Sequence, residues 1–170
     1  MYSIIKFIEN VLKFLRIKIK IIYWKLKYGK RIKLGKNFRF RKGLIINIAK
    51  NGYLEIGDDC AFNNYCSINC RKKIIIGNNN MFGENVKFYD HNHVFNNKSI
   101  DIRYTYSEHE IVIGNNNWIA SNVTILSKAK LGNYNVISSN ALLNEEYKDE
   151  YIIKNELEKK AEKIKYKKEK

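Results

Sequence analysis

A chain of 170 residues is long enough for one domain with a buried core and too short for two ordinary ones. Three cysteines, no proline and no segment patterned like a cleavable signal peptide argue against a secreted, disulfide-stapled domain, so we expect a cytoplasmic location. The net charge of +15 is uneven: residues 1–42 hold fourteen Lys and Arg against one acid, whereas residues 43–144 hold nine against eight. Because the central region is nearly neutral, we expect no nucleic-acid partner.

Residues 1–30 are predicted to form a basic amphipathic helix. Apolar side chains recur at helical spacing at Ile4, Ile8, Val11, Leu12 and Leu15. Charged residues interrupt the segment every few positions, so we do not expect it to span a membrane. Two roles stay open and are compatible: the helix can pack on an open end of the following domain, or it can lie peripherally on the inner face of the plasma membrane.

Residues 31–144 carry an internal repeat with a period of six. In the second half, an aliphatic residue returns at every sixth position, at Ile113, Ile119, Ile125, Leu131, Ile137 and Leu143. The same period occurs in three earlier runs, at Leu34, Phe40 and Ile46, at Ile56, Phe62 and Ile68, and at Ile76, Phe82 and Phe88. This period fits neither a helix nor an alternating strand. It predicts an all-β fold, a parallel β-helix of about five three-sided coils with Gly and Asn at tight corners.

The period breaks once, over residues 89–112, and this excursion contains all three histidines of the chain. A long excursion from a regular solenoid is more often functional than accidental. A loop histidine is suited to act as a general base at neutral pH. Zinc binding by His91, His93 and His109 is the competing interpretation, although their spacing is not typical of a zinc site. The cysteines Cys60, Cys66 and Cys70 are expected to be buried packing residues.

Two stretches resemble the hexapeptide-repeat acetyltransferases: "MFGENVKFYDHNHVF" and "VIGNNNWIASNVTILSKAKLGNYNVISSNALL". The branch that they suggest contains galactoside and maltose acetyltransferases and the O-acetyltransferases of capsule and lipopolysaccharide synthesis. The resemblance implies a left-handed β-helix, a homotrimer, and acetyl-CoA as the acyl donor without a metal. The acceptor would be a hydroxyl of a sugar or glycan.

The resemblance places His93 on the family's catalytic histidine, with His91 as the second candidate for the base. It places Asn85 on the residue that contacts the acceptor sugar. Asp90 is expected either to orient an imidazole and lie at the acceptor site, or to be a solvated turn residue without a role. Loop residues Arg103, Tyr104 and Tyr106 are further candidates to stack on or clamp a sugar.

On the donor side, the resemblance places Trp118 beside the acetyl and pantetheine arm. Ser121 matches the position whose backbone amide faces the thioester oxygen, and Ser139 lies where a coil edge approaches coenzyme A. Ala120 and Ser138 stand at corner positions where the family usually has glycine. In such trimers, His93 and Trp118 are expected to act from different chains.

The sequence departs from the family after the last repeat. The family's Thr-Lys pair and its proline-containing segment are replaced by Asn144 and Glu145, and residues 145–170 are predicted to form a charged helical tail. This leaves the contacts to the phosphates of coenzyme A undefined. Two alternatives therefore stay open: a catalytically decayed binding or scaffold protein, and an N-acetyltransferase of an amino-sugar nucleotide.

Overall fold

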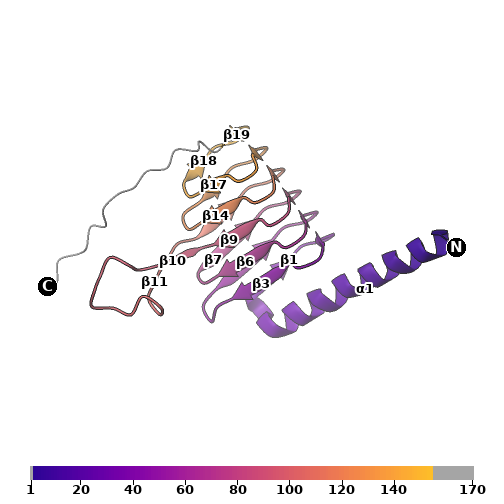
Figure 1. Cartoon of the computed structure of the whole chain (residues 1–170), viewed down its shortest axis with the longest axis horizontal. Helices are drawn as coiled ribbons and strands as arrows, with labels where there is room; N and C mark the ends of the chain where they lie inside the picture. Colours follow the sequence, from indigo (N-terminus) through magenta and orange to yellow (C-terminus); the bar gives the residue numbers. More distant parts are fainter. Residues whose placement is uncertain (1, 155–170) are drawn as a thin grey trace.

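The computed structural model describes residues 2–154, and its strands stack in three parallel sheets that form a triangular prism (Figure 1). Sheet A contains β1 (Ile32–Leu34), β4 (Tyr53–Ile56), β7 (Lys73–Ile76), β12 (Ile111–Ile113), β15 (Lys130–Leu131) and β18 (Glu146–Tyr147). Sheet B contains β2 (Arg39–Phe40), β5 (Ala61–Phe62), β8 (Met81–Phe82), β13 (Trp118–Ile119), β16 (Val136–Ile137) and β19 (Ile152–Ile153). Sheet C contains β3 (Ile45–Ile48), β6 (Ser67–Cys70), β9 (Lys87–Tyr89), β14 (Thr124–Leu126) and β17 (Leu142–Leu143). The predicted β-helix is therefore confirmed.

The six-residue period holds within each coil, and the coils differ in length at one corner. Residues stacked on one another are 22, 20, 37, 18 and 16 positions apart from the first coil to the last. All of the variation falls between a strand of sheet C and the next strand of sheet A, a turn that we call the C–A corner. The histidine excursion is the longest insertion at this corner.

The prism has a sixth coil that the sequence interpretation missed. Strands β18 and β19 continue sheets A and B, and Tyr147 and Ile153 pack against the core. The prediction of about five coils was therefore one coil short, and the prediction of a helical tail was wrong for residues 146–153. The remainder of that predicted tail, residues 155–170, lies outside the described residues.

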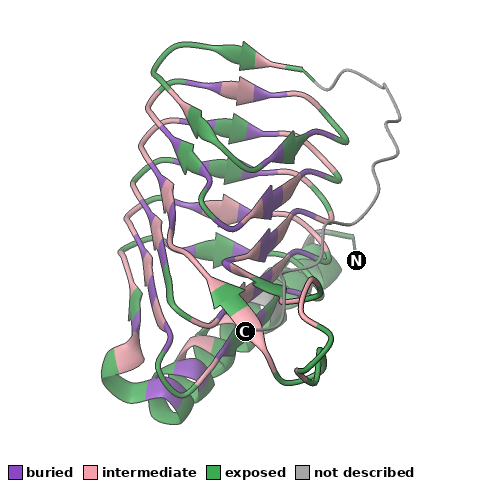
Figure 2. Cartoon of the chain, turned by 90° about the vertical axis from the view of Figure 1, so that its left-hand side faces the viewer, coloured by how far each residue is buried: buried purple, intermediate pink, exposed green. Residues whose placement is uncertain are grey.

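The repeat residues form a continuous apolar column inside the prism (Figure 2), and all of them are buried except Leu34, which is partly buried. Phe62 and Phe82 stack with their ring centroids 4.2 Å apart. Asparagines support the corners between sheets A and B: the amide of Asn78 donates to the side-chain oxygen of Asn115 at 2.8 Å, and the amide of Asn115 donates to that of Asn133. Each coil is thus bonded to the next through a corner side chain as well as through its strands.

The predicted N-terminal helix is α1 (Tyr2–Tyr28), followed by a short 3₁₀ turn, η1 (Gly29–Arg31). Its last turns cover the open end of the first coil, where Trp24 and Tyr28 are buried. The hydroxyl of Tyr28 donates to the carbonyl of Ile46 at 2.8 Å. Toward its N-terminus the helix runs out past the base of the prism (Figure 1). Within residues 2–154, no helix combines the length and the apolar character needed to cross a bilayer.

The three cysteines are free and buried in the prism, as expected. Burial raises the pKa of the Cys60 and Cys66 thiols, and it raises the pKa of Cys70 to about 12, with a further contribution from the nearby Asp90 carboxylate. Because the thiolate is the reactive form, we expect the native protein not to react with a disulfide reagent at about pH 8. A colorimetric thiol titration, before and after unfolding in urea, checks this. Fast reaction of the native protein would contradict it.

Candidate functional site

The histidine excursion begins and ends as an antiparallel ribbon that projects from the C–A corner (Figure 1). Strand β10 (His91–His93) pairs with β11 (Tyr106–Glu108), with His91 opposite Glu108 and His93 opposite Tyr106. Because side chains alternate along a strand, these four side chains share one face of the ribbon. The ribbon therefore brings both candidate bases together.

His93 is exposed, and its Nδ1 lies 2.6 Å from the carbonyl oxygen of Ile102. A carbonyl only accepts hydrogen bonds, so Nδ1 carries the proton in the neutral ring and Nε2 keeps a lone pair. The ring also lies 4.6 Å from that of Tyr106, measured between centroids. These contacts orient the imidazole and leave Nε2 as the proton acceptor.

Asp90 is completely buried, so the alternative of a solvated turn aspartate was wrong. Its carboxylate accepts hydrogen bonds from the backbone amides of Arg71, Lys72 and Lys73, at 2.7 to 3.0 Å. It also lies 3.1 Å from Nδ1 of His91, a half-buried ring. Asp90 thus ties the coil below to the start of the ribbon and holds one histidine.

Arg71 and Glu108 are two residues of this site that the sequence interpretation missed. The Arg71 guanidinium lies 3.6 Å from the ring centroid of Tyr106, and its Nε donates to Glu108 at 2.8 Å. Arg71 precedes β7, whereas Tyr106 and Glu108 lie in the last strand of the excursion, so the coil register brings the three together. Their contacts fix the side of the ribbon that carries the histidines.

A cavity of about 380 Å³ lies beside this cluster, between the end of α1 and the outer face of sheet C. His91, Arg71 and Tyr89 line it near the ribbon, and Asn47 and Asn69 line it along the sheet. Amide groups, an aromatic ring and a cation are groups that can hydrogen-bond to and stack on a polar ligand. The cavity is therefore a binding space lined by one of the two candidate bases, His91.

The other predicted acceptor residue, Asn85, lies at the far end of β9 from the histidines. Its backbone has a φ of 56°, a left-handed corner conformation that asparagine tolerates. Its side-chain amide donates to Asn122 at 3.0 Å. Within one chain, the structure places Asn85 with the corner between sheets B and C and away from the ribbon.

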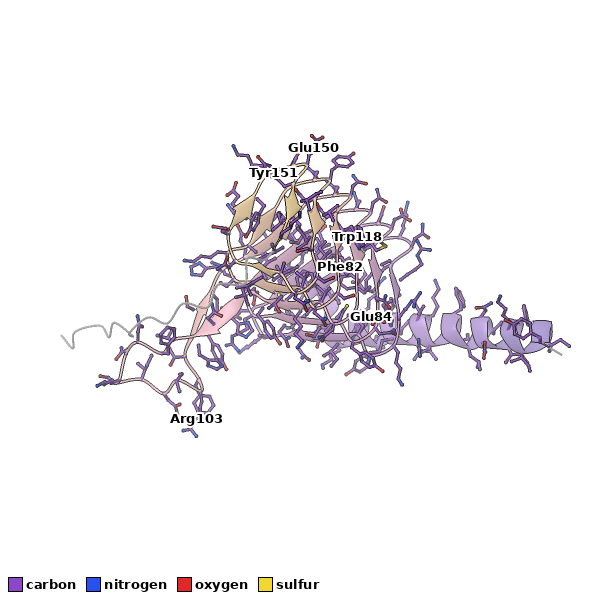
Figure 3. All side chains as sticks on the ribbon, turned by 45° about the horizontal axis from the view of Figure 1, so that its top comes forward. Phe82, Glu84, Arg103, Trp118, Glu150 and Tyr151 are labelled. Carbon is purple, nitrogen blue, oxygen red and sulfur yellow. The ribbon has the colours of Figure 1, made fainter. Side chains whose placement is uncertain are left out.

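The predicted donor residues also lie away from the histidines. Trp118 is half exposed on the outer face of sheet B, in register with Met81 and Val136. Figure 3 shows Trp118 and Glu84 on one side of the prism and the loop that carries Arg103 on another. A single chain thus separates the predicted base from the predicted donor wall.

The four corner residues predicted on the donor side differ in their hydrogen bonds and in their exposure. The amides of Ala120 and Ser138 already donate to Ile137 and Ile153, at 3.0 and 2.9 Å, so neither is free to bind a ligand. Within the described residues, the amide of Ser121 has no hydrogen-bond acceptor, and its hydroxyl accepts from the amide of Glu84 at 3.2 Å. Ser139 is exposed at the same corner.

Comparisons with known proteins agree with this architecture. Residues 110–145 match the family model described as bacterial transferase hexapeptide (six repeats). Residues 110–145 therefore carry the hexapeptide repeat. A search of curated protein sequences gave no significant match.

Solved structures show the same fold. One is a hexapeptide-repeat-containing acetyltransferase from Vibrio cholerae, with a TM-score of 0.59, 22% identity, and coverage of 70% of this chain and 69% of that chain. Its complex with acetyl-coenzyme A, from Vibrio cholerae O1 biovar eltor, has a TM-score of 0.62 and 19% identity, over 76% and 68% of the two chains. A mutant of AntD, an N-acyltransferase from Bacillus cereus in complex with dTDP and coenzyme A, has a TM-score of 0.50 and 16% identity, over 72% and 78%. These matches confirm the left-handed β-helix.

The remaining predicted loop residues lie toward the tip of the excursion. Tyr104 is exposed beside Arg103, whose guanidinium pairs with Asp101 at 2.8 Å. His109 contacts a different kind of group from the other two histidines: its Nε2 lies 3.4 Å from the hydroxyl oxygen of Ser107. Among residues 2–154, no three His, Cys, Asp or Glu side chains are grouped as metal ligands would be.

Proposed function

We propose that this protein transfers an acetyl group from acetyl-CoA to a hydroxyl group of a sugar or glycan, with His93 as the general base. The observation that supports this best is the 2.6 Å contact of His93 Nδ1 with the Ile102 carbonyl, which leaves Nε2 unprotonated in the neutral ring. A hydroxyl attacks more readily when an oriented base removes its proton, and the exposed His93 on the ribbon can serve as that base. His91 is the second candidate, held by Asp90.

Acetyl-CoA is the proposed donor. A structural neighbour with the same fold has been solved with acetyl-CoA. In this chain, the amide of Ser121 is free to donate to a thioester oxygen, and the half-exposed indole of Trp118 can shield the pantetheine arm from water. We place the reaction in the cytoplasm, where acetyl-CoA is available and free thiols such as those of this chain persist.

The two halves of the proposed site lie apart in a single chain, so we propose that they meet between chains and that the working form is a homotrimer. The ribbon projects from the C–A corner, whereas Trp118 and Ser121 lie on sheet B and at its far corner. The outer face of sheet B presents Met81, Trp118 and Ile152, which are all exposed in the single chain. An apolar face of this kind is typical of a surface that a neighbouring subunit covers.

The mechanism that follows needs one base and one oxyanion donor. Nε2 of His93 takes the proton from the acceptor hydroxyl as its oxygen attacks the thioester carbon. The amide of Ser121 from the adjacent chain donates to the oxyanion that develops. The carbon–sulfur bond then breaks, and the proton on Nε2 passes to the departing thiolate, so the products are the acetyl ester and coenzyme A. Asn85 lies at the same corner as Ser121, and we propose that it hydrogen-bonds to the acceptor across the interface.

The acceptor is proposed to be a sugar, and a nucleotide-linked sugar is the form to test first. The cavity beside His91 offers amides, a tyrosine and an arginine to a polar ligand. AntD, which shares the fold, has been solved with dTDP and coenzyme A together. The fold therefore accommodates a nucleotide and the acyl carrier at once.

A direct assay tests the function. Purified protein is incubated with acetyl-CoA and a panel of sugars, nucleotide-linked sugars and glycans, and released coenzyme A is followed with a thiol reagent. Mild alkali then distinguishes the products, because it removes an O-acetyl ester and leaves an N-acetyl amide. Alkali-stable product would overturn the proposed hydroxyl acceptor. No calorimetric signal with acetyl-CoA or coenzyme A would instead indicate a decayed scaffold.

Trp118→Ala is expected to raise KM for acetyl-CoA by about tenfold, because it removes an aromatic contact to the donor arm. We expect kcat to change much less, since the indole carries no proton in the reaction. Steady-state kinetics at saturating acceptor checks this. An unchanged KM would remove Trp118 from the donor site.

A further inference from the structure

Helix α1 has one side that the prism uses and another that it leaves uncovered. Trp24 and Tyr28 are buried against the first coil, and Ile17 and Ile21 pack beside them. Eight of the uncovered apolar side chains gather on one side of the helix, and we call them the outer stripe: Ile4, Ile8, Val11, Leu12, Leu15, Ile19, Ile22 and Leu26. At 3.6 residues per turn, the centre of the outer stripe lies about 150° around the helix from the covered side. The outer stripe therefore points away from the prism.

The outer stripe is too long and too apolar to be an ordinary solvated surface. Each of its eight side chains is at least 40% exposed. The stripe runs almost the whole length of α1, which is about 40 Å at 1.5 Å per residue. Contiguous exposed apolar surface of this extent usually marks a site of interaction with another protein or with a membrane.

The charges on the helix decide between these occupants. The helix carries seven Lys and Arg and a single acid, Glu9. By the helical spacing, Lys18 and Lys25 lie along one edge of the outer stripe, and Arg16 and Lys27 lie along the other. Pairing two copies through this stripe would bring like charges together, whereas an anionic lipid surface would neutralise them.

We propose that α1 docks on an anionic membrane surface through its outer stripe, with the prism on the aqueous side. The apolar side chains enter the boundary between headgroups and acyl chains, and the flanking cations contact the lipid headgroups. The helix lies in the plane of the surface, consistent with the lack of a segment fit to cross a bilayer in residues 2–154. Its last turns pack on the first coil, so the docked helix holds the prism at the membrane.

Vesicle flotation with the full chain tests this proposal. Binding to phosphatidylcholine vesicles is compared with binding to vesicles that contain about one third phosphatidylglycerol. We expect binding to the anionic vesicles, weakened by added salt, and little binding to the neutral ones. Ile8→Glu, which puts a charge into the outer stripe, should weaken binding at least about tenfold.

Asn10→Glu is the matched control, because it adds the same charge two residues away, at a position that lines a groove between the helix and the prism. We expect it to bind within about threefold of the original chain. Equal loss in both variants, equal binding to neutral and anionic vesicles, or no binding at all would overturn the proposal. Sedimentation tests the competing occupant. If Ile8→Glu dissociates an oligomer and Asn10→Glu does not, a second copy covers the outer stripe and the proposal is overturned.

Discussion

His93→Ala is expected to lower the rate of acetyl transfer by a factor of about 10² to 10⁴, the usual contribution of a general base. The loss should appear in kcat, because the exposed imidazole of His93 is proposed to act on the proton of a bound acceptor. The fold should be unaffected, since the ring is exposed and its contacts with Ile102 and Tyr106 lie at the surface of the ribbon. Steady-state kinetics on the identified acceptor, with circular dichroism to check the fold, measures both.

His91→Ala is the matched control for this prediction. His91 shares the ribbon face and the neighbouring ring of Tyr106, whose centroid lies 5.5 Å away, but it is half buried against Asp90. We expect a smaller loss of activity, within about tenfold. If His91→Ala abolishes transfer and His93→Ala does not, the base is His91 and the assignment of the two histidines is reversed.

Asp90→Ala is expected to destabilise the protein by about 3–5 kcal/mol, the cost of removing one partner of a buried charged network. The substitution leaves the amides of Arg71, Lys72 and Lys73 without their acceptor inside the protein. Urea unfolding, followed by circular dichroism, measures the free energy of unfolding. Because His91 also loses its partner, the ribbon should become more susceptible to proteolysis before the prism unfolds.

Asp101→Ala provides the comparison for a carboxylate that is paired at the surface. The adjacent Arg103 guanidinium lowers the pKa of Asp101, but both groups are exposed in the loop. Solvent screens such an exposed pair, so we expect little change in the free energy of unfolding. Equal destabilisation by Asp90→Ala and Asp101→Ala would show that the buried network does not anchor the ribbon.

The repeat was readable in the sequence because each coil places inward residues at fixed spacing. From Ile113 to Leu143 the C–A corner adds no extra residues, so six positions follow one another without a break. The next C–A corner, after Leu143, is two residues shorter, so Tyr147 and Ile153 no longer fall at the positions that the six-residue period predicts. The sixth coil was therefore missed, and its charged surroundings were interpreted as a helical tail.

The ribbon cluster was only partly predictable for a related reason. His91 and His93 stand in the break of the repeat, so the sequence marks them directly. Asp90 is buried, and Arg71 contacts Glu108, because of the way successive coils are aligned. Asp90 and Lys72 are 18 positions apart in the sequence, and Arg71 and Glu108 are 37 apart. These pairings cannot be known before the corner lengths are known. Within one chain, Trp118 lies away from the histidines because of the way the coils wind in three dimensions. The family resemblance predicted this only indirectly, by implying a trimer in which His93 and Trp118 act from different chains.

The proposal that the active site forms between two chains is tested most directly by a crystal structure of the protein with acetyl-CoA bound. The account predicts a trimer in which the thioester oxygen lies about 3 Å from the amide of Ser121 in one chain. The acetyl carbon should lie within reach of an acceptor hydroxyl bound at His93 Nε2 of the adjacent chain. Acetyl-CoA bound away from both groups, or held beside Ser121 with no neighbouring ribbon near it, would contradict the account.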